Sequence, residues 1–142
     1  MTAIQQEPQP AALPARLATL RGNCMGAGVL LIVQVALGTG VSLYVTLPKH
    51  GTFFAAVFGS ALLASHAIVA LLLLGAAVGA LARAIRVRKG ITFTAVGLAA
   101  VLVAAFAGAS FAGNGASGAS LTMALATAVA LFCYLAAVFT IR

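Results

Sequence analysis

Acidic side chains are almost absent from this sequence of 142 residues, in which Glu7 is the single carboxylate side chain. A carboxylate pair for general acid–base catalysis is therefore excluded. Histidine and cysteine occur twice each, at spacings that match no zinc or iron–sulfur motif. No glycine-rich phosphate loop follows a strand either. We therefore expect a protein that is not an enzyme.

Charge of either sign is also scarce, since 6% of the residues are charged and 63% are hydrophobic, with a mean hydropathy of +1.18. Soluble domains carry about 25% charged residues. The composition therefore predicts an integral membrane protein. The net charge of +7 comes from basic residues beside apolar runs, where they normally set membrane topology, so it does not indicate a nucleic-acid partner.

Long apolar runs supply the architecture. They cover about residues 25–47, 53–82, 91–111 and 120–141, and each is long enough to cross the bilayer, which takes about 20 helical residues. Short connections make consecutive helices antiparallel neighbours. The sequence thus predicts an all-α domain over residues 23–142, a four-transmembrane-helix up-down bundle.

The region before the first run has a different composition. Residues 1–22 are polar and include Pro8, Pro10 and Pro14, which disfavour helix, so we expect a disordered N-terminal tail. The first apolar run exceeds a signal-peptide core of about 7–15 residues. We expect it to remain as the first membrane helix.

The distribution of basic residues predicts the orientation. Seven basic residues fall on one side of the membrane, and Lys49 falls on the other. The seven are Arg16, Arg21, Arg83, Arg86, Arg88, Lys89 and Arg142. By the positive-inside rule both termini are expected to be cytoplasmic, in a bacterial-type plasma membrane that the chain crosses several times. The loop residues Arg83, Arg86, Arg88 and Lys89 either set topology alone or also bind anionic lipid headgroups, at about 1 kcal/mol each.

Two polar side chains interrupt the apolar runs. Gln34 lies 13 residues before Leu47, and His66 lies 13 residues after Phe53. At 1.5 Å per residue, both are about 20 Å below the same membrane boundary. Because the first two helices are antiparallel neighbours, Gln34 and His66 can form a structural polar pair, with a hydrogen bond of about 0.6 kcal/mol.

Axial ligation of haem b is the alternative role for His66, because a buried imidazole in a four-helix bundle is a common haem ligand. The small residues around it leave room for a flat macrocycle. A second histidine at the same depth is missing, since His50 falls in the outer loop. Met123 is the conceivable sixth ligand. If His66 does not bind haem b, we expect the protein to have no cofactor.

A resemblance to a known family rests on the same region. VQVALGTGV (33–41), LPKHG in the outer loop and SHAIVALLLLG in the second helix together resemble one four-helix half of haem A synthase over residues 28–80. The matching positions are Gln34, Leu37, Gly38 and His66. The resemblance implies a relative that either binds haem, with His66 as a single ligand, or has lost haem binding. It does not imply haem A synthesis, because the family's fourth-helix histidine and catalytic glutamate are absent.

Taken together, these features predict a small membrane protein without its own catalytic site. We expect an accessory or interaction subunit, in a larger membrane complex or a homo-oligomer, and the alternative is a haem-b electron-transfer protein. A transporter or channel is less consistent with the lack of intramembrane charge. Cys24 and Cys133 are expected to stay reduced. Small-xxx-small spacings such as Gly22–Gly26 and Ala104–Gly108 allow close helix packing.

Overall fold

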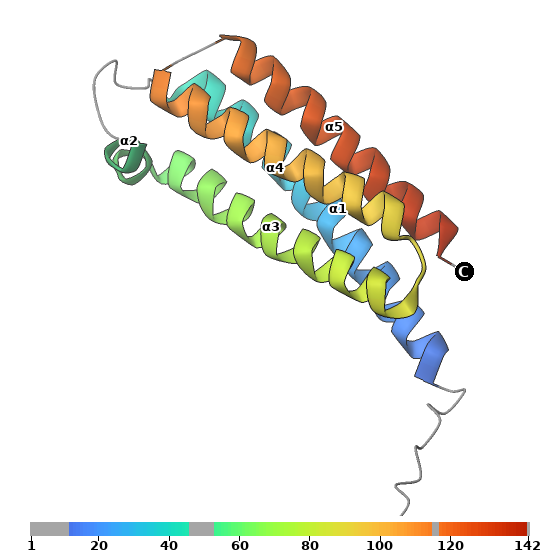
Figure 1. Cartoon of the computed structure of the whole chain (residues 1–142). Coiled ribbons are helices and arrows are strands. Elements are labelled where there is room, and N and C mark those ends of the chain that lie inside the picture. Colours follow the sequence, from blue (N-terminus) through green and yellow to red (C-terminus); the bar gives the residue numbers. More distant parts are fainter. Residues whose placement is uncertain (1–11, 46–52, 115–116, 142) are drawn as a thin grey trace, which may run out of the picture.

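Helices form the whole regular structure of the described part of the chain, which is residues 12–45, 53–114 and 117–141 of a computed structural model. Four helices are long and apolar enough to cross a membrane (Figure 1). These are α1 (Ala12–Tyr44), α3 (Ala61–Val87), α4 (Ile91–Asn114) and α5 (Ser117–Thr140). A short helix, α2 (Phe53–Gly59), precedes α3. The described part of the chain is therefore all-helical, and its four long apolar helices indicate a multi-pass membrane protein.

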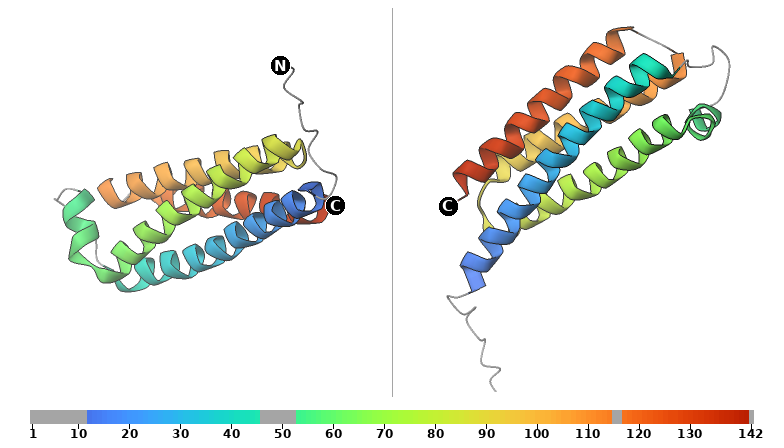
Figure 2. Two further views of the ribbon diagram at one scale, coloured as in Figure 1. Left: turned by 90° about the horizontal axis from the view of Figure 1, so that it is seen from below. Right: turned by 180° about the vertical axis from the view of Figure 1, so that it is seen from behind.

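The four long helices form a closed ring. Helix α1 packs against α3 and α5, and α4 packs against the same two helices. Their directions alternate along the chain, as Figure 2 shows from two sides. The bundle has two distinct ends. The basic end holds the start of α1, the α3–α4 turn and the end of α5, and the α2 end lies opposite (Figure 1).

Helix α1 begins earlier than the sequence analysis predicted. It starts at Ala12, so the expectation of disorder is wrong for residues 12–22, and residues 1–11 lie outside the described part. Pro14 does not interrupt the helix because it lies in the first turn, where the missing N–H has no helical partner anyway. With 33 residues, α1 is about 50 Å long. Its first turns extend beyond the other helices at the basic end (Figure 1).

The second predicted span is divided. Instead of one helix over 53–82, the structure has α2, a break, and then α3, which continues to Val87. Ser60 has extended dihedral angles, and its Oγ accepts a hydrogen bond of 3.4 Å from the Leu63 N–H. Gly59 and Ser60 thus end one helix and cap the next. Helix α2 turns across the end of the bundle (Figure 2).

The α3–α4 connection is tight because two residues adopt left-handed backbone angles. Arg88 has φ +55° and Gly90 has φ +69°. A Cβ atom at Gly90 would also lie 3.1 Å from Cδ1 of Ile141, at the end of α5. The turn therefore packs directly against the last residues described, and this closes the basic end.

Packing is much denser toward the basic end than toward the α2 end. The main core cluster is built from small residues at helix contacts and a few large ones, among them Leu20, Ala27, Ala80, Tyr134 and Ala137, all fully buried. Alanine lets the backbones approach closely, which is the main source of helix packing in lipid. A separate cluster of Val41, Val57 and Leu63 is the buried core at the α2 end.

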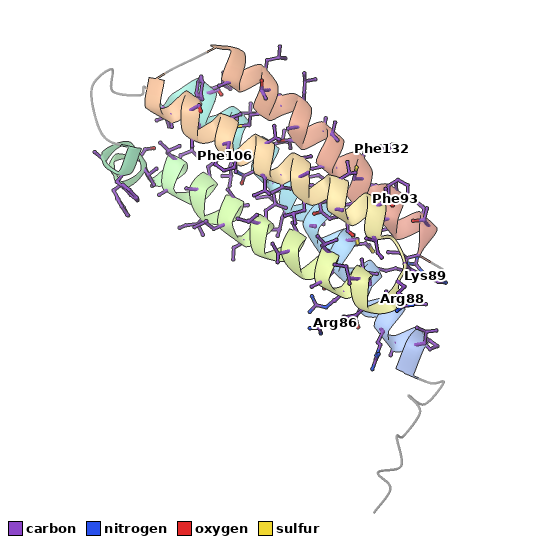
Figure 3. All side chains as sticks on the ribbon, viewed as in Figure 1. Arg86, Arg88, Lys89, Phe93, Phe106 and Phe132 are labelled. Carbon is purple, nitrogen blue, oxygen red and sulfur yellow. The ribbon has the colours of Figure 1, made fainter. Side chains whose placement is uncertain are left out.

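Large apolar side chains cover the outside of the bundle. Phe106 of α4 and Phe132 of α5, both labelled in Figure 3, are 73% and 68% exposed. Soluble proteins rarely expose apolar surface on this scale. This surface is suited to contact with lipid.

Candidate functional site: a polar pair at the wall of a cavity

The two polar residues of the first apolar hairpin meet. Nε2 of Gln34 on α1 lies 3.0 Å from Nε2 of His66 on α3, and both side chains are half-buried. This distance is typical of a hydrogen bond. The contact joins the first two membrane-spanning helices directly.

The contact leaves one polar atom on each side chain without a partner. With the amide N–H donating to Nε2, the imidazole proton is on Nδ1, and Nδ1 of His66 and Oε1 of Gln34 are buried without a hydrogen bond. With the amide turned over, Nε2–H donates to Oε1 instead. Either arrangement leaves one donor group and one acceptor group unpaired.

A glycine determines how closely the imidazole approaches α1. Gly38 lies one helical turn after Gln34, on the same face. A Cβ atom at Gly38 would lie 3.2 Å from Cε1 and 3.7 Å from Nδ1 of His66. The ring therefore packs over the bare backbone of α1, and this brings Nε2 within reach of the amide.

The pair forms although both helix ends differ from the predicted ones. Helix α1 ends at Tyr44, and α3 begins at Ala61. Gln34 is therefore about 15 Å from the end of its helix and His66 about 8 Å from the start of its own. Since the two side chains are level, α1 projects past α3 at the α2 end, where α2 crosses the bundle.

A cavity of about 440 Å³ occupies the bundle next to this pair. All four membrane-spanning helices contribute to its wall, and Val57 of α2 contributes as well. Gln34, Gly38 and His66 form part of the wall on the α1–α3 side. Ala104 and Gly108 line the α4 side. The sequence marked these two small residues only as a packing motif, and their role in making space was missed.

The cavity wall is mainly apolar and contains no charged side chain among the described residues. Besides the Gln34–His66 pair, it includes the hydroxyl groups of Ser42 and Ser120, and two threonine hydroxyl groups that donate within their own helices. Thr39 donates to the Val35 carbonyl at 2.9 Å, and Thr127 donates to the Met123 carbonyl at 2.7 Å. An uncharged, mostly apolar occupant suits such a wall.

The other residues singled out by the sequence are distributed as follows. Met123 lines the same cavity as His66, and its Sδ lies 3.3 Å from where a Cβ of Gly108 would be. His50 lies outside the described residues. Arg83, Arg86, Arg88 and Lys89 lie at the basic end, away from the cavity; three of them are labelled in Figure 3. Arg83 donates to the Gly79 carbonyl at 3.2 Å.

Tyr134 of α5 is a second buried polar group in the bundle. Its side chain is fully buried, and its hydroxyl has no hydrogen-bond partner among the described residues. Cys24 and Cys133 are free and buried. Gly97 makes room for the ring, since a Cβ there would lie 3.0 Å from Cζ. The Tyr134 side chain belongs to the main core cluster, and it does not line the cavity.

The described residues contain no group of three or more histidine, cysteine or acidic side chains that could hold a metal ion. The Gln34–His66 pair at the cavity wall is thus the main candidate site. Comparison of the chain with family models, with curated proteins and with solved structures found no match.

Proposed function

We propose that this chain is an accessory membrane protein without a catalytic site of its own, and that it holds a lipophilic small molecule in the cavity beside Gln34 and His66. The observation that carries the proposal is the cavity itself. Protein interiors are close-packed, with few voids larger than a water molecule. A space of about 440 Å³ lies within the range of ligand pockets, about 300–1,000 Å³.

The position of the polar pair supports the same function. Ligand sites combine apolar walls with a few polar groups that orient the ligand. Here the unpaired atoms of Gln34 and His66 belong to side chains of the cavity wall. A buried polar atom without a partner costs about 1–3 kcal/mol. A ligand that hydrogen-bonds to this pair recovers that cost.

Orientation and location are part of the proposal. The basic residues of the described chain gather at one end of the bundle (Figure 3), so this end faces the cytoplasm by the positive-inside rule. The cavity then lies in the outer half of a bacterial-type plasma membrane. Arg86, Arg88 and Lys89 lie at the level of anionic lipid headgroups. A larger membrane complex, or a second copy, contacts the apolar exterior.

Analysis of the purified protein for bound small molecules tests this function. We expect organic extraction followed by mass spectrometry to detect one compound enriched over the bulk lipid. Ala104→Leu fills the cavity and should remove that compound, whereas Ala99→Leu on the exposed side of α4 should retain it. An extract that matches the bulk lipid in all three proteins would overturn the proposal. Co-purification of a larger complex after mild solubilisation tests the accessory role.

A haem-b electron-transfer protein is the second candidate, because His66 and Met123 line one cavity, and histidine with methionine is a known haem ligand set. The fit is incomplete. Nε2 of His66 contacts Gln34, and Nδ1 is buried over Gly38. His66 can hold haem iron only after the Gln34 contact breaks.

Absorption spectroscopy separates the two candidates. Haem binding predicts a Soret band in protein purified from cells supplied with haem, with loss of the band in His66→Ala and an altered band in Met123→Leu. A colourless preparation rules out the haem candidate and leaves the lipophilic-ligand function in place.

A further inference from the structure

We propose that the cavity binds the ring of an isoprenoid quinone, a neutral ring with two carbonyl oxygens and a lipid tail. This inference rests on the proposed ligand-binding function and specifies its ligand class. It is carried by the charge, the hydrogen-bonding capacity and the shape of the cavity wall.

The wall restricts the ligand to neutral molecules. No charged side chain lines the cavity in the described part of the chain, and an unpaired charge in a low-dielectric site is strongly disfavoured. Phospholipid headgroups and carboxylate-bearing ligands are therefore poor occupants. Quinones are uncharged and dissolve in the hydrocarbon that surrounds the bundle.

The polar pair matches both oxidation states of a quinone. With Gln34 Nε2–H donating to His66 Nε2, the unpaired groups are the Nδ1–H donor and the Oε1 acceptor. The donor suits a quinone carbonyl, and the acceptor suits a quinol hydroxyl. Turning the amide over exchanges the two capacities between the residues. Hydrocarbon lipids without such oxygens leave both groups unpaired.

A small side-chain adjustment brings the pair to the ligand. Both unpaired atoms are shielded, although their side chains line the cavity. Rotation of the His66 ring about its last side-chain bond turns Nδ1 away from Gly38. Imidazoles have a broad torsional minimum at this bond. The rotation also breaks the contact with Gln34. The carbonyl oxygen of the quinone then replaces Nε2 of His66 as the hydrogen-bond acceptor for the Gln34 amide.

The shape of the cavity suits a flat ring with a tail. Ala67, Ala104 and Gly108 give low walls on α3 and α4. The lining also includes Val35 of α1 and Leu71 of α3, which are 52% and 70% exposed. The cavity therefore reaches the lipid-facing surface, where a tail can leave. The ligand enters from the bilayer, not from water.

The test uses the full chain in lipid nanodiscs and a photoreactive azidoquinone with a short saturated tail as the probe. We expect saturable labelling of peptides that line the cavity. An unlabelled quinone with the same tail should compete, and an oxygen-free benzene ring with the same tail should not. Non-saturable labelling, or equal competition by the oxygen-free ring, would overturn the inference.

Substitutions at and beside the cavity test whether the quinone binds there. Gln34→Leu and His66→Leu should each weaken competition by unlabelled quinone about ten-fold. Ser65→Ala, a neighbour of His66 that is exposed and outside the cavity, should leave it unchanged. If a polar-pair variant fails to fold, Ala104→Leu serves instead, because it fills the cavity and retains the pair. Undiminished labelling in Ala104→Leu would contradict this site.

Failure of the inference is distinguishable from failure of the proposed function. In one outcome the extract contains an enriched oxygen-free lipophile, Ala104→Leu loses it, and the azidoquinone does not label the protein. This outcome shows that the protein binds a ligand but that the ligand is not a quinone. A protein whose extract matches the bulk lipid and that is not labelled loses both. Enrichment of a quinone in the extract, together with competed labelling, supports both.

Discussion

Gly38 of α1 lies directly beneath the imidazole of His66, so that a Cβ atom at this position would come within 3.2 Å of Cε1. The absence of a side chain at Gly38 allows His66 to approach α1 and reach Gln34. The packing of the ring and the polar contact are therefore two parts of the same helix–helix interface.

Gly38→Ala should displace the His66 ring and break its contact with Gln34. Overpacking of this kind costs about 1–3 kcal/mol, and we expect a loss near the lower limit because the ring can move. Thermal unfolding in detergent measures the change. Gly26→Ala is the matched control, since it lies in the same helix with nothing within 4 Å of its added methyl group. It should be neutral or slightly stabilising, and equal destabilisation by both changes would contradict the role of Gly38.

The polar contact predicts that Gln34→Leu and His66→Leu are coupled. Each single change leaves the other side chain without its partner, whereas the double change removes both polar groups. We expect a coupling free energy of about 0.6 kcal/mol, the average for such bonds in membranes. A double-mutant cycle on the free energy of unfolding measures this value. Strict additivity would show that the contact contributes nothing to stability.

Tyr134→Phe should maintain or raise stability. The hydroxyl is fully buried and has no hydrogen-bond partner among the described residues, so its removal abolishes a desolvation cost of about 1 kcal/mol. Gly97→Ala should have the opposite effect, because its methyl group would lie 3.0 Å from the Tyr134 ring. Unfolding of both variants in one detergent gives the comparison. A large loss of stability in Tyr134→Phe would reveal a role for the hydroxyl group.

The proposed orientation predicts which end is accessible in intact cells. In a variant without Cys24 and Cys133, Gly118→Cys at the α2 end should react with a membrane-impermeant maleimide. Arg86→Cys at the basic end should react only after permeabilisation, because the positive-inside rule places it in the cytoplasm. Both positions are exposed, so access to the reagent is comparable. The reverse labelling pattern would invert the topology.

The four-span architecture could be predicted from the sequence because hydrophobic length is a direct requirement of the bilayer. The prediction of the Gln34–His66 contact from the sequence has a weaker physical basis. Counting residues from the ends of the apolar runs placed both side chains at one depth, but the structure ends α1 at Tyr44 and starts α3 at Ala61. The pairing holds because α1 projects past α3, an offset that residue counting does not reveal.

Two features were missed for identifiable physical reasons. The break at Gly59–Ser60 lies within an apolar run, and hydropathy does not register a capping serine. The cavity depends on how the helices rotate and how far apart they lie. Small residues such as Ala104 close a helix contact in one rotation and open a space in another. Composition alone therefore could not distinguish a packing motif from a cavity wall.

The unequal packing of the two ends has a consequence for motion within the membrane. The basic end holds the main core cluster, whereas the α2 end has a cavity and only Val41, Val57 and Leu63 as a separate buried cluster. Local opening is easiest where buried contacts are few. The first turns of α3 can therefore separate from α4 while the opposite half stays assembled. We therefore expect backbone hydrogen exchange to be faster at Ala64, near the cavity, than at Ala80 in the main core cluster.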